Sequence, residues 1–515
     1  MSIVLVTLMS AMSMVNDERP DGSLFHLTGA APTIRFGEIT NPCDLRLQQA
    51  FSPDSEIAES AAIVSTCELM VNGSAVARSL SQLGSDNARL HEENAHLRSR
   101  LEEMERQVER ILEMLPASSL TSSRTSALDV ASLGADLKGF HGGFTDGVYG
   151  YLVPNRFGPG YGNGGDYGAK VVRFALNNFD LSSVSVLDLA SVEPDLKGYM
   201  TGFRSGAYGY LVPWYSGVPS YNGKIVRFAL DNFDVSGVSV LDLADVDSTL
   251  YPSINQGYIG GFATGGFGYL VPKQRHGNLV RFRLDNFDVS GVTVLDVEPL
   301  GGPTSSPTSP SGMLFGGFQG GFTDGLYGYY YPRQYANGND QGFLVRVALD
   351  SFDANGVSML NFTNVDPTIT GFNGGFAYGG YGYLVPYVCR WTPSGYNTKI
   401  VRFALANFDE TGVSTVELTT LHPTPEHGGI YSGGFTDGVY GYLVPSLGNN
   451  TNAVRFDLQS FTVSGLSQLE LANELDMCGF RGGFSDGRFG YLVPGACLQT
   501  GESSKVVRIS AYAWQ

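Results

Sequence analysis

The residues of this 515-residue chain that could carry chemistry are His, Asp and Glu side chains in short polar segments. His422 and His427 bracket Glu426, and these three side chains could hold a metal ion if their loop folded back on itself. Their irregular spacing, with two prolines in between, does not match the ligand spacing of zinc sites. We therefore predict no metal and no other cofactor.

Loop carboxylates are a second source of chemistry. Two Asp or Glu side chains at a fixed separation can act as acid and base, or acid and nucleophile, in cleaving a glycosidic bond. The sequence alone places no two of them at such a separation, so we name no catalytic residue. A glycan hydrolase or lyase is the alternative that these side chains support. They are Asp166, Glu193, Asp195, Asp245, Asp247 and Glu426.

The chain repeats one motif seven times. The string GGFTDGVYGYLVP ends at Pro154 and again at Pro445, and five looser copies accompany it. Each copy continues into a VRF-type run, and a period of about 50 to 60 residues is typical of propeller blades. Four runs per copy alternate with a period of two between Asp-Gly, Asn and Ser turns, which predicts four antiparallel strands. The Asp of FTDG is interpreted as a turn residue.

The fourth strand of each copy indicates a closed ring. VSVLDL-type runs end six copies, whereas the seventh copy ends in KVVRISAYAWQ. A matching run, SALDV at residues 126–130, precedes the first copy. We predict that this strand completes the seventh blade, because ring-shaped propellers close in this way and leave only short, protected sheet edges.

Each copy also has an arginine in its third strand, and in six copies an acidic or polar residue follows 15 positions later. A hairpin centred between the two would place them opposite each other, within reach of an ion pair. Because a single catalytic centre does not need seven equal pairs, we interpret them as structural. The predicted pairs are Arg173 with Asp188, Arg227 with Asp242, Arg281 with Asp296 and, across the ring, Arg508 with Asp129.

Over residues 124–515 the array resembles seven-bladed β-propellers of the WD-repeat and kelch kinds. The repeat length and the four strands per copy carry the resemblance, and the paired glycines of GGF are loosely similar to kelch repeats. The Gly-His and Trp-Asp signature of WD repeats is absent. The resemblance implies an all-β, seven-bladed β-propeller closed by an N-terminal strand, and it implies no site residue.

The segments that differ between copies are the loops that follow the YLVP-type run. They are rich in Tyr, Trp, Arg, Asn and Gly, and in propellers such loops share one face. Aromatic rings beside adaptable polar groups are typical of recognition surfaces. We predict ligand contacts at Trp214, Tyr215, Tyr221, Arg275, His276, Arg333, Tyr335, Arg390, Trp391 and Tyr396.

A helical segment is expected before the array. Apolar residues between Leu80 and Leu115 alternate at three and four positions, with Asn87 and Asn94 on the same seam. This heptad pattern predicts an α-helical coiled coil over residues 75–116, and asparagine in the seam favours a parallel dimer. The run RLEEME at 100–105 also resembles a trimer motif, so a trimer stays open.

The remaining N-terminal residues carry weaker signals. Residues 1–15 form a candidate signal peptide without the usual basic start, residues 16–74 are expected to be partly disordered, and residues 117–123 form a linker. Five cysteines show no CxxC spacing. We expect a secreted or extracellular protein, with a cytoplasmic location as the alternative. No run reaches the ~18 apolar residues of a membrane span.

Composition bounds the partners. A formal net charge of −18 excludes a protein held mainly by nucleic-acid phosphates, because such proteins need a cationic stripe. We expect a binding or scaffolding protein that presents one propeller face to a protein or glycan ligand. Self-association through the coiled coil would let weak sites act together.

Overall fold

The structure is a computed structural model of two compact units, Met1–Pro116 and Ala117–Gln515. It describes residues 34–36, 44–49, 63–65 and 125–514, except 158–165, 218–219, 222, 247–253, 255–256, 274–277, 298–317, 333–341, 388–396, 422–430, 447–451, 472–478, 498–500 and 511–513. The candidate signal peptide, coiled coil and linker lie outside these residues. In the first unit, β1 (Ile34–Phe36), β2 (Asp44–Gln49) and β3 (Ile63–Ser65) form an antiparallel sheet.

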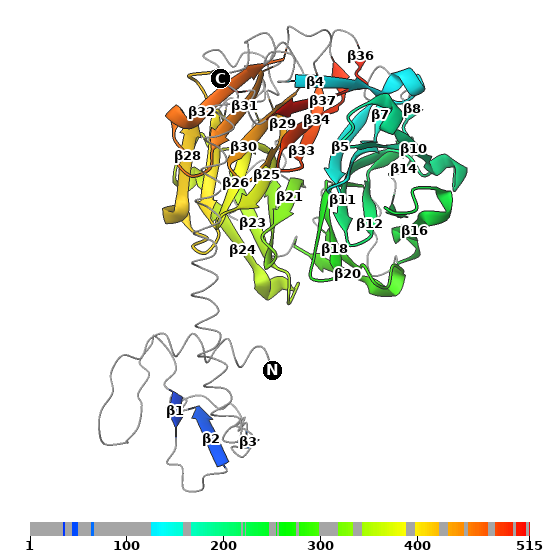
Figure 1. Ribbon diagram of the computed structural model, residues 1–515. Helices are drawn as coiled ribbons and strands as arrows, with labels where there is room; N and C mark the ends of the chain where they lie inside the picture. Colours follow the sequence, from blue (N-terminus) through cyan, green and yellow to red (C-terminus); the bar gives the residue numbers. More distant parts are fainter. Residues whose placement is uncertain are drawn as a thin grey trace, which may run out of the picture. The chain divides into compact units, whose positions relative to one another are not determined.

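The second unit is a seven-bladed β-propeller of four-stranded antiparallel sheets (Figure 1). Blades 1 to 3 are β5 (Phe140–Thr145), β6 (Tyr149–Pro154), β9 (Lys170–Ala175), β10 (Ser185–Asp188); β11 (Tyr199–Ser205), β12 (Tyr208–Pro213), β15 (Lys224–Ala229), β16 (Val238–Asp242); and β17 (Tyr258–Thr264), β18 (Phe267–Pro272), β19 (Asn278–Arg283), β20 (Val292–Asp296). Blades 4 and 5 are β21 (Phe318–Thr323), β22 (Tyr327–Pro332), β23 (Phe343–Ala348), β24 (Val357–Asn361); and β25 (Phe372–Tyr378), β26 (Tyr381–Pro386), β27 (Lys399–Ala404), β28 (Val413–Glu417).

The last two blades complete the ring. Blade 6 is β29 (Tyr431–Thr436), β30 (Tyr440–Pro445), β31 (Asn452–Asp457) and β32 (Leu466–Glu470). Blade 7 is β33 (Phe480–Ser485), β34 (Phe489–Pro494), β37 (Lys505–Ser510) and, from the other end of the unit, β4 (Thr125–Asp129). Figure 1 shows β4, in cyan, beside β37, in red. The strand expected to complete the seventh blade is thus paired with β37.

Small elements fill the connections. Two-stranded hairpins extend from blades 1, 2 and 7, and they are β7 (Arg156–Phe157) with β8 (Asp166–Tyr167), β13 (Tyr215–Gly217) with β14 (Ser220–Tyr221), and β35 (Ala496–Cys497) with β36 (Gly501–Glu502). The short 3-10 helices are η1 (Val130–Leu133), η2 (Leu181–Ser183), η3 (Leu189–Ser191), η4 (Val235–Gly237), η5 (Leu243–Asp245), η6 (Val289–Gly291), η8 (Ala354–Gly356), η9 (Phe362–Asn364), η10 (Glu410–Gly412) and η11 (Val463–Gly465).

The core lies between neighbouring blades. The second strand of each blade is buried at five of its six positions, since both of its faces pack against other sheets. Its repeated glycine is required by a close contact: a Cβ at Gly150 would lie 2.6 Å from the ring of Phe174 in the next strand. The YGYLVP motif is therefore explained by packing, and it needs no functional role.

The predicted arginine–carboxylate pairs are wrong. The register places Arg173 opposite Ser185, and it places Asp188 opposite Lys170. The same three-residue offset separates the other predicted pairs. In blades 1 to 3 the turn between the third and fourth strands contains a 3-10 helix, so it is not centred where a simple hairpin would be. In blade 7, where no turn joins β37 to β4, the pairing has the same register as in the other blades. Arg227, Arg281 and Arg508 face Ser239, Thr293 and Ser126, while Asp242, Asp296 and Asp129 face Lys224, Asn278 and Lys505.

The arginines instead join each blade to the next. The guanidinium of Arg173 lies 4.5 Å from the ring of Tyr149 in its own blade and 4.3 Å from the ring of Phe233 in blade 2. Its Nη1 donates a hydrogen bond to the backbone oxygen of Leu230, also in blade 2. Such a cation–π stack contributes ~1 to 2 kcal/mol where the cation is partly desolvated. Arg227, Arg281, Arg346, Arg402, Arg455 and Arg508 are stacked between two rings in the same way.

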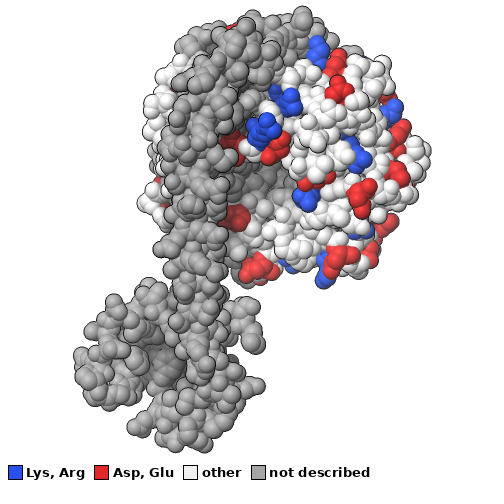
Figure 2. Space-filling model, in the orientation of Figure 1, with Lys and Arg blue, Asp and Glu red and all other residues white. Residues whose placement is uncertain are grey.

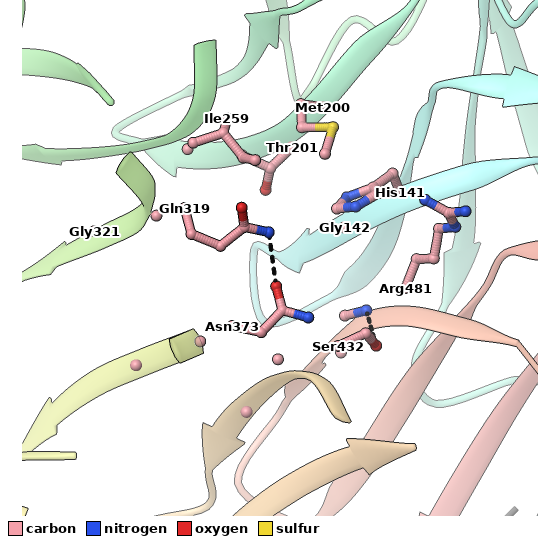
Figure 3. A pocket seen from close by; sticks show the side chains of 18 of the residues that line it. His141, Gly142, Met200, Thr201, Ile259, Gln319, Gly321, Asn373, Ser432 and Arg481 are labelled. Atoms are coloured by element: carbon pink, nitrogen blue, oxygen red, sulfur yellow. Dashed lines mark hydrogen bonds between the residues drawn. The ribbon is translucent and has the colours of Figure 1, made fainter. Parts of the chain in front are cut away.

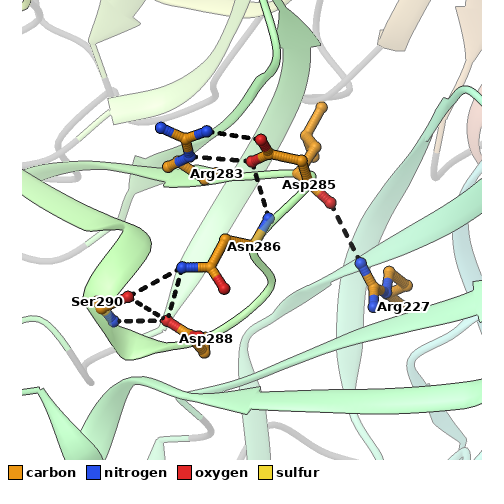
Figure 4. A network of polar contacts seen from close by, with 7 residues as sticks. Arg227, Arg283, Asp285, Asn286, Asp288 and Ser290 are labelled. Atoms are coloured by element: carbon orange, nitrogen blue, oxygen red, sulfur yellow. Dashed lines mark hydrogen bonds and ion pairs between the residues drawn. The ribbon is translucent and has the colours of Figure 1, made fainter.

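Figure 4 shows the turn that receives one of these arginines. Arg227 donates to the backbone oxygen of Leu284, and Arg283 makes two contacts to the carboxylate of Asp285 at 2.9 and 2.6 Å. The Asp288 carboxylate caps the N-terminus of η6 by accepting hydrogen bonds from the backbone N–H and the hydroxyl of Ser290. The turns are thus stabilised by their own side chains, and the charged residues of the repeat are part of the framework.

Candidate functional site

One position of the repeat differs in every blade. It is the second residue of the innermost strand, directly before the GGF-type run, and the innermost strands contact one another in succession around the ring. All seven of these side chains line one central cavity of about 190 Å³, which we call the channel cavity (Figure 3). They are, from blade 1 to blade 7, His141, Met200, Ile259, Gln319, Asn373, Ser432 and Arg481.

A β-bulge accompanies this position in each blade. In β5, Phe140 pairs with Pro154 and Gly143 pairs with Leu152, so one extra residue is inserted around His141. Equivalent shifts occur in the other six inner strands. Bulges bend a strand and redirect side chains near functional sites. Here the bulge lies where a variable side chain borders the cavity.

Glycine at the next position lets the inner strands approach closely. A Cβ at Gly374 would lie 2.8 Å from the Cα of Gly433 in the neighbouring blade. Blade 2 departs from the pattern, because Thr201 stands where the other blades have glycine. Gly142 faces this threonine with φ of +68°, and a Cβ there would lie 2.7 Å from Thr201 Oγ1. Backbone atoms of the closely spaced inner strands therefore narrow the cavity. Its polar and apolar character comes from the seven variable side chains.

The amide and hydroxyl side chains of blades 4 to 6 hydrogen-bond in sequence around the ring (Figure 3). Gln319 Nε2 donates to Asn373 Oδ1 at 2.9 Å, and Asn373 Nδ2 donates to the backbone oxygen of Tyr431 at 2.8 Å. Ser432 Oγ donates to the backbone oxygen of Phe480 and accepts from the N–H of Gly482. These bonds orient the polar wall before any ligand arrives.

The opposite wall is basic. Figure 3 shows His141 and Arg481 on one side of the cavity. Burial, with smaller effects from the charges of Arg481 and Lys273, lowers the pKa of His141 to about 3, against a hydrogen bond to the Met200 backbone. His141 Nδ1 is buried and has no hydrogen-bond partner. This imidazole is therefore neutral near pH 7, beside a permanently charged guanidinium.

Near the cavity, three aromatic rings in succession lie between two cations along blades 1 to 3, in what we call the aromatic row. The rings of Tyr167 and Tyr215 meet edge to face at 5.5 Å, and Trp214 lies 6.0 Å from Tyr215. Arg156 lies 6.0 Å from the Tyr167 ring, and Lys273 Nζ lies 4.7 Å from the Trp214 ring. All five side chains are partly exposed. Large rigid rings beside cations are the composition of protein-binding surfaces.

Three of the ten predicted contact residues fall in the part of the chain that the structure describes. Trp214 and Tyr215 belong to the aromatic row, and Trp214 also packs against the hydrophobic cluster that contains Met200. Tyr221 is paired with Tyr215 across the hairpin of β13 and β14. The other seven, which lie outside the described residues, are Arg275, His276, Arg333, Tyr335, Arg390, Trp391 and Tyr396.

The candidate catalytic carboxylates do not line the channel cavity where they are described. Glu193 and Asp195 both pair with Lys224, at 2.6 and 3.0 Å. Asp166 is exposed in β8, and Asp245 ends η5. Asp247 and Glu426, like His422 and His427, lie outside the described residues. Among the described residues, no group of three or more His, Cys, Asp or Glu side chains could hold a metal ion.

Sequence analysis missed the seven cavity residues. Their signal was present: within strands that are almost invariant between copies, one position changes in every copy. A period-two pattern does not reveal a bulge, so strand alternation alone does not single out this position.

Within the described residues, no helix has the length and apolar character that a membrane crossing requires.

No family model matches this chain, and no curated protein matches it. Solved structures match it in fold. The WD40 domain of Pan2 from Neurospora crassa is 7% identical with a TM-score of 0.44, over 76% of this chain and 96% of that chain. The WD40 repeats of RRP9 are 6% identical with a TM-score of 0.47, over 76% and 98%. At these identities the likeness concerns the fold alone.

Proposed function

We propose that this protein binds another protein through the propeller face that carries the channel cavity, and that it catalyses no reaction itself. One observation carries the proposal. Seven copies keep the same framework, while the one inner-strand position that differs in every blade presents seven different side chains to one cavity. A framework needs the same residues in every copy, whereas a recognition site needs residues that differ between the copies.

The aromatic row supports a protein ligand. It lies near the cavity, because Trp214 packs against the hydrophobic cluster that contains Met200 and the charge of Lys273 lowers the pKa of His141. The row and the cavity together offer rings, cations, amides and one apolar wall. Such a mixture suits a folded protein or an exposed peptide, whose side chains vary in the same way.

Two other ligand classes are weaker. A glycan could stack on Tyr215 and Tyr167, but the cations of the row add nothing for a neutral sugar. A hydrolase or lyase would need carboxylates around its substrate, and Glu193 and Asp195 are engaged with Lys224 in ion pairs. A glycan array and a hydrolase panel would reveal either class.

Self-association belongs to the same proposal. If residues 75–116 form a parallel coiled coil, two or three propellers are tethered, and a second binding event becomes intramolecular. Avidity of that kind exceeds single-site affinity by ~10² to 10⁴ without new contacts. A peptide of residues 75–118 should sediment as a dimer, and monomeric behaviour at high micromolar concentration would remove the avidity argument.

The test of protein binding uses variants on the two ends of the blades. Partners captured from the source organism are purified and their affinity for the propeller is measured. Tyr215→Ala should weaken binding at least 10-fold, because central aromatic residues dominate interface energies. Val148→Ala is the matched control, since this exposed residue lies in the turn at the far end of β5 from His141.

Both variants should keep the melting temperature of the parent protein within a few degrees, since both side chains are at least partly exposed. Equal affinities of the two variants for every purified partner would overturn the proposal. So would turnover of a glycan substrate that is lost on replacing a loop carboxylate.

A further inference from the structure

The seven cavity residues divide into three neighbouring arcs. Arg481 and His141 are basic and come from blades 7 and 1, which adjoin where the ring closes. Blades 2 and 3 contribute an apolar wall, and blades 4 to 6 contribute the hydrogen-bonded polar wall described above. Figure 3 shows this division, with Met200 and Ile259 apart from the basic pair. A cavity that is charged on one side and apolar on another is suited to an ionic group on a short hydrocarbon stem.

The sign of the charge indicates an anion. The chain has 50 acidic and 32 basic residues, and yet no Asp or Glu is among the described residues that line the cavity. Figure 2 shows acidic and basic side chains interspersed over the coloured part of the propeller surface. The cavity therefore differs from the surface, because the described side chains that border it are cationic or neutral.

Space for Arg481 is provided by the framework. A Cβ at Gly495 would lie 2.4 Å from Arg481 Cγ, so any larger residue at 495 would displace the arginine stem. The residue after proline is variable in this repeat, and glycine occurs there in blade 7 alone. Gly495 is thus a positioning residue for the guanidinium.

The size of the cavity limits the anion. The cavity is small, at about 190 Å³, so a compact anion such as a short-chain carboxylate suits it better than a large one. A phosphate dianion would meet one permanent charge and an apolar wall that cannot solvate it, whereas the stem of a carboxylate would pack on Met200 and Ile259.

We propose that the channel cavity binds a carboxylate on a short aliphatic stem, with Arg481 as the charged partner and with Met200 and Ile259 as the apolar contacts of the stem. An acidic side chain of the protein partner and a free small carboxylic acid share this chemistry. The first source rests on the proposed function, and the second does not.

The experiment measures binding of sodium propionate, with sodium phosphate as the competing anion, to the full chain by calorimetry and by the shift in melting temperature. Propionate should bind the parent protein at least 10-fold more tightly than it binds Arg481→Gln. Arg204→Gln is the matched control, because this exposed arginine lies at the other end of an inner strand. It should bind propionate as the parent does.

A second arm distinguishes the two sources. If Arg481→Gln also weakens binding of the purified protein partner at least 10-fold, the carboxylate is an acidic side chain of that partner. If partner affinity is unchanged while propionate binding is lost, the carboxylate is a free acid, and the proposed protein binding stands on the aromatic row alone. Equal binding of propionate to the parent and to Arg481→Gln, or tighter binding of phosphate, would overturn the carboxylate site.

Discussion

Arg508 of blade 7 stacks on Phe179 of blade 1, with its Cζ 4.7 Å from the ring centroid. Its Nε also donates to Ser126 Oγ in β4 at 3.1 Å. Arg508 lies in β37, the last strand of the propeller, and thus contacts both the first strand, β4, and blade 1. The same stack recurs between the other blades, so the seam between first and last blade is built like the rest.

Arg508→Met should lower the free energy of unfolding by about 1 to 3 kcal/mol, because it keeps the apolar stem but removes the stack and the hydrogen bond. Urea unfolding at pH 7.5 measures this. Arg488→Met is the matched control: Arg488 is exposed, its guanidinium lies 5.0 Å from the Phe489 ring, and its loss should cost under about 0.5 kcal/mol. Equal losses in both variants would contradict the proposed role of the stack.

A shortened chain tests the strand that joins the two ends. A protein that begins at Gly139 lacks β4 and leaves β37 with an unpaired edge. It should aggregate, or melt well below a protein that begins at Ser122, because a bare flat edge pairs with other chains. Size-exclusion chromatography and thermal melting compare the two. Identical behaviour would mean that the ladder between β4 and β37 contributes nothing to stability.

Gly142→Ala should be more destabilising than Gly147→Ala. Both glycines have positive φ, at +68° and +91°, so both substitutions strain the backbone. A Cβ at position 142 would lie 2.7 Å from Thr201 Oγ1, whereas a Cβ at position 147 would have no described atom within 4 Å. We expect an additional loss of roughly 1 to 3 kcal/mol for overpacking.

Thr201→Gly in the Gly142→Ala background should recover part of that loss, since the other inner strands carry glycine at this position. The double-mutant cycle in urea unfolding isolates the pair. A coupling energy of zero would show that the strain of positive φ alone explains the loss at Gly142.

The fold could be predicted further than the site, for physical reasons. Each copy repeats the same strand alternation and the same turn residues, so seven concordant patterns predict the blades. The pairing of Arg173 with Asp188 failed because a 3-10 turn shifts the register by three residues, and alternation does not report turn geometry. Trp214 and Tyr215 were predicted as ligand contacts because loop aromatics stand out by composition; the structure places them in the aromatic row, and their contact with a ligand stays a prediction. His141 and Arg481 were missed because bulged strands enclose the cavity they line, and closure of a ring is not visible in one repeat.

The last prediction concerns the lowered pKa of His141. Its pKa is about 3 in the folded chain, against an ordinary value of 6.5, because it is buried and lies beside Arg481 and Lys273. Below pH 6.5, His141 takes up a proton in the unfolded chain but stays neutral in the folded chain. Stability should therefore fall as pH falls from 6.5 towards 3, whereas above 6.5 this residue has no effect on it.

His141→Gln removes this contribution while keeping a polar side chain at the cavity. Relative to the parent protein, its free energy of unfolding should rise by about 1 to 2 kcal/mol between pH 7.5 and pH 4.5, since carboxylates elsewhere titrate in both proteins. Arg481→Gln should give a smaller rise of the same sign, because it removes only one of the two repelling charges. Parallel stability curves for the parent and His141→Gln across this range would show that the imidazole takes up a proton as readily in the folded chain as in the unfolded one, and the cavity would then not hold it neutral.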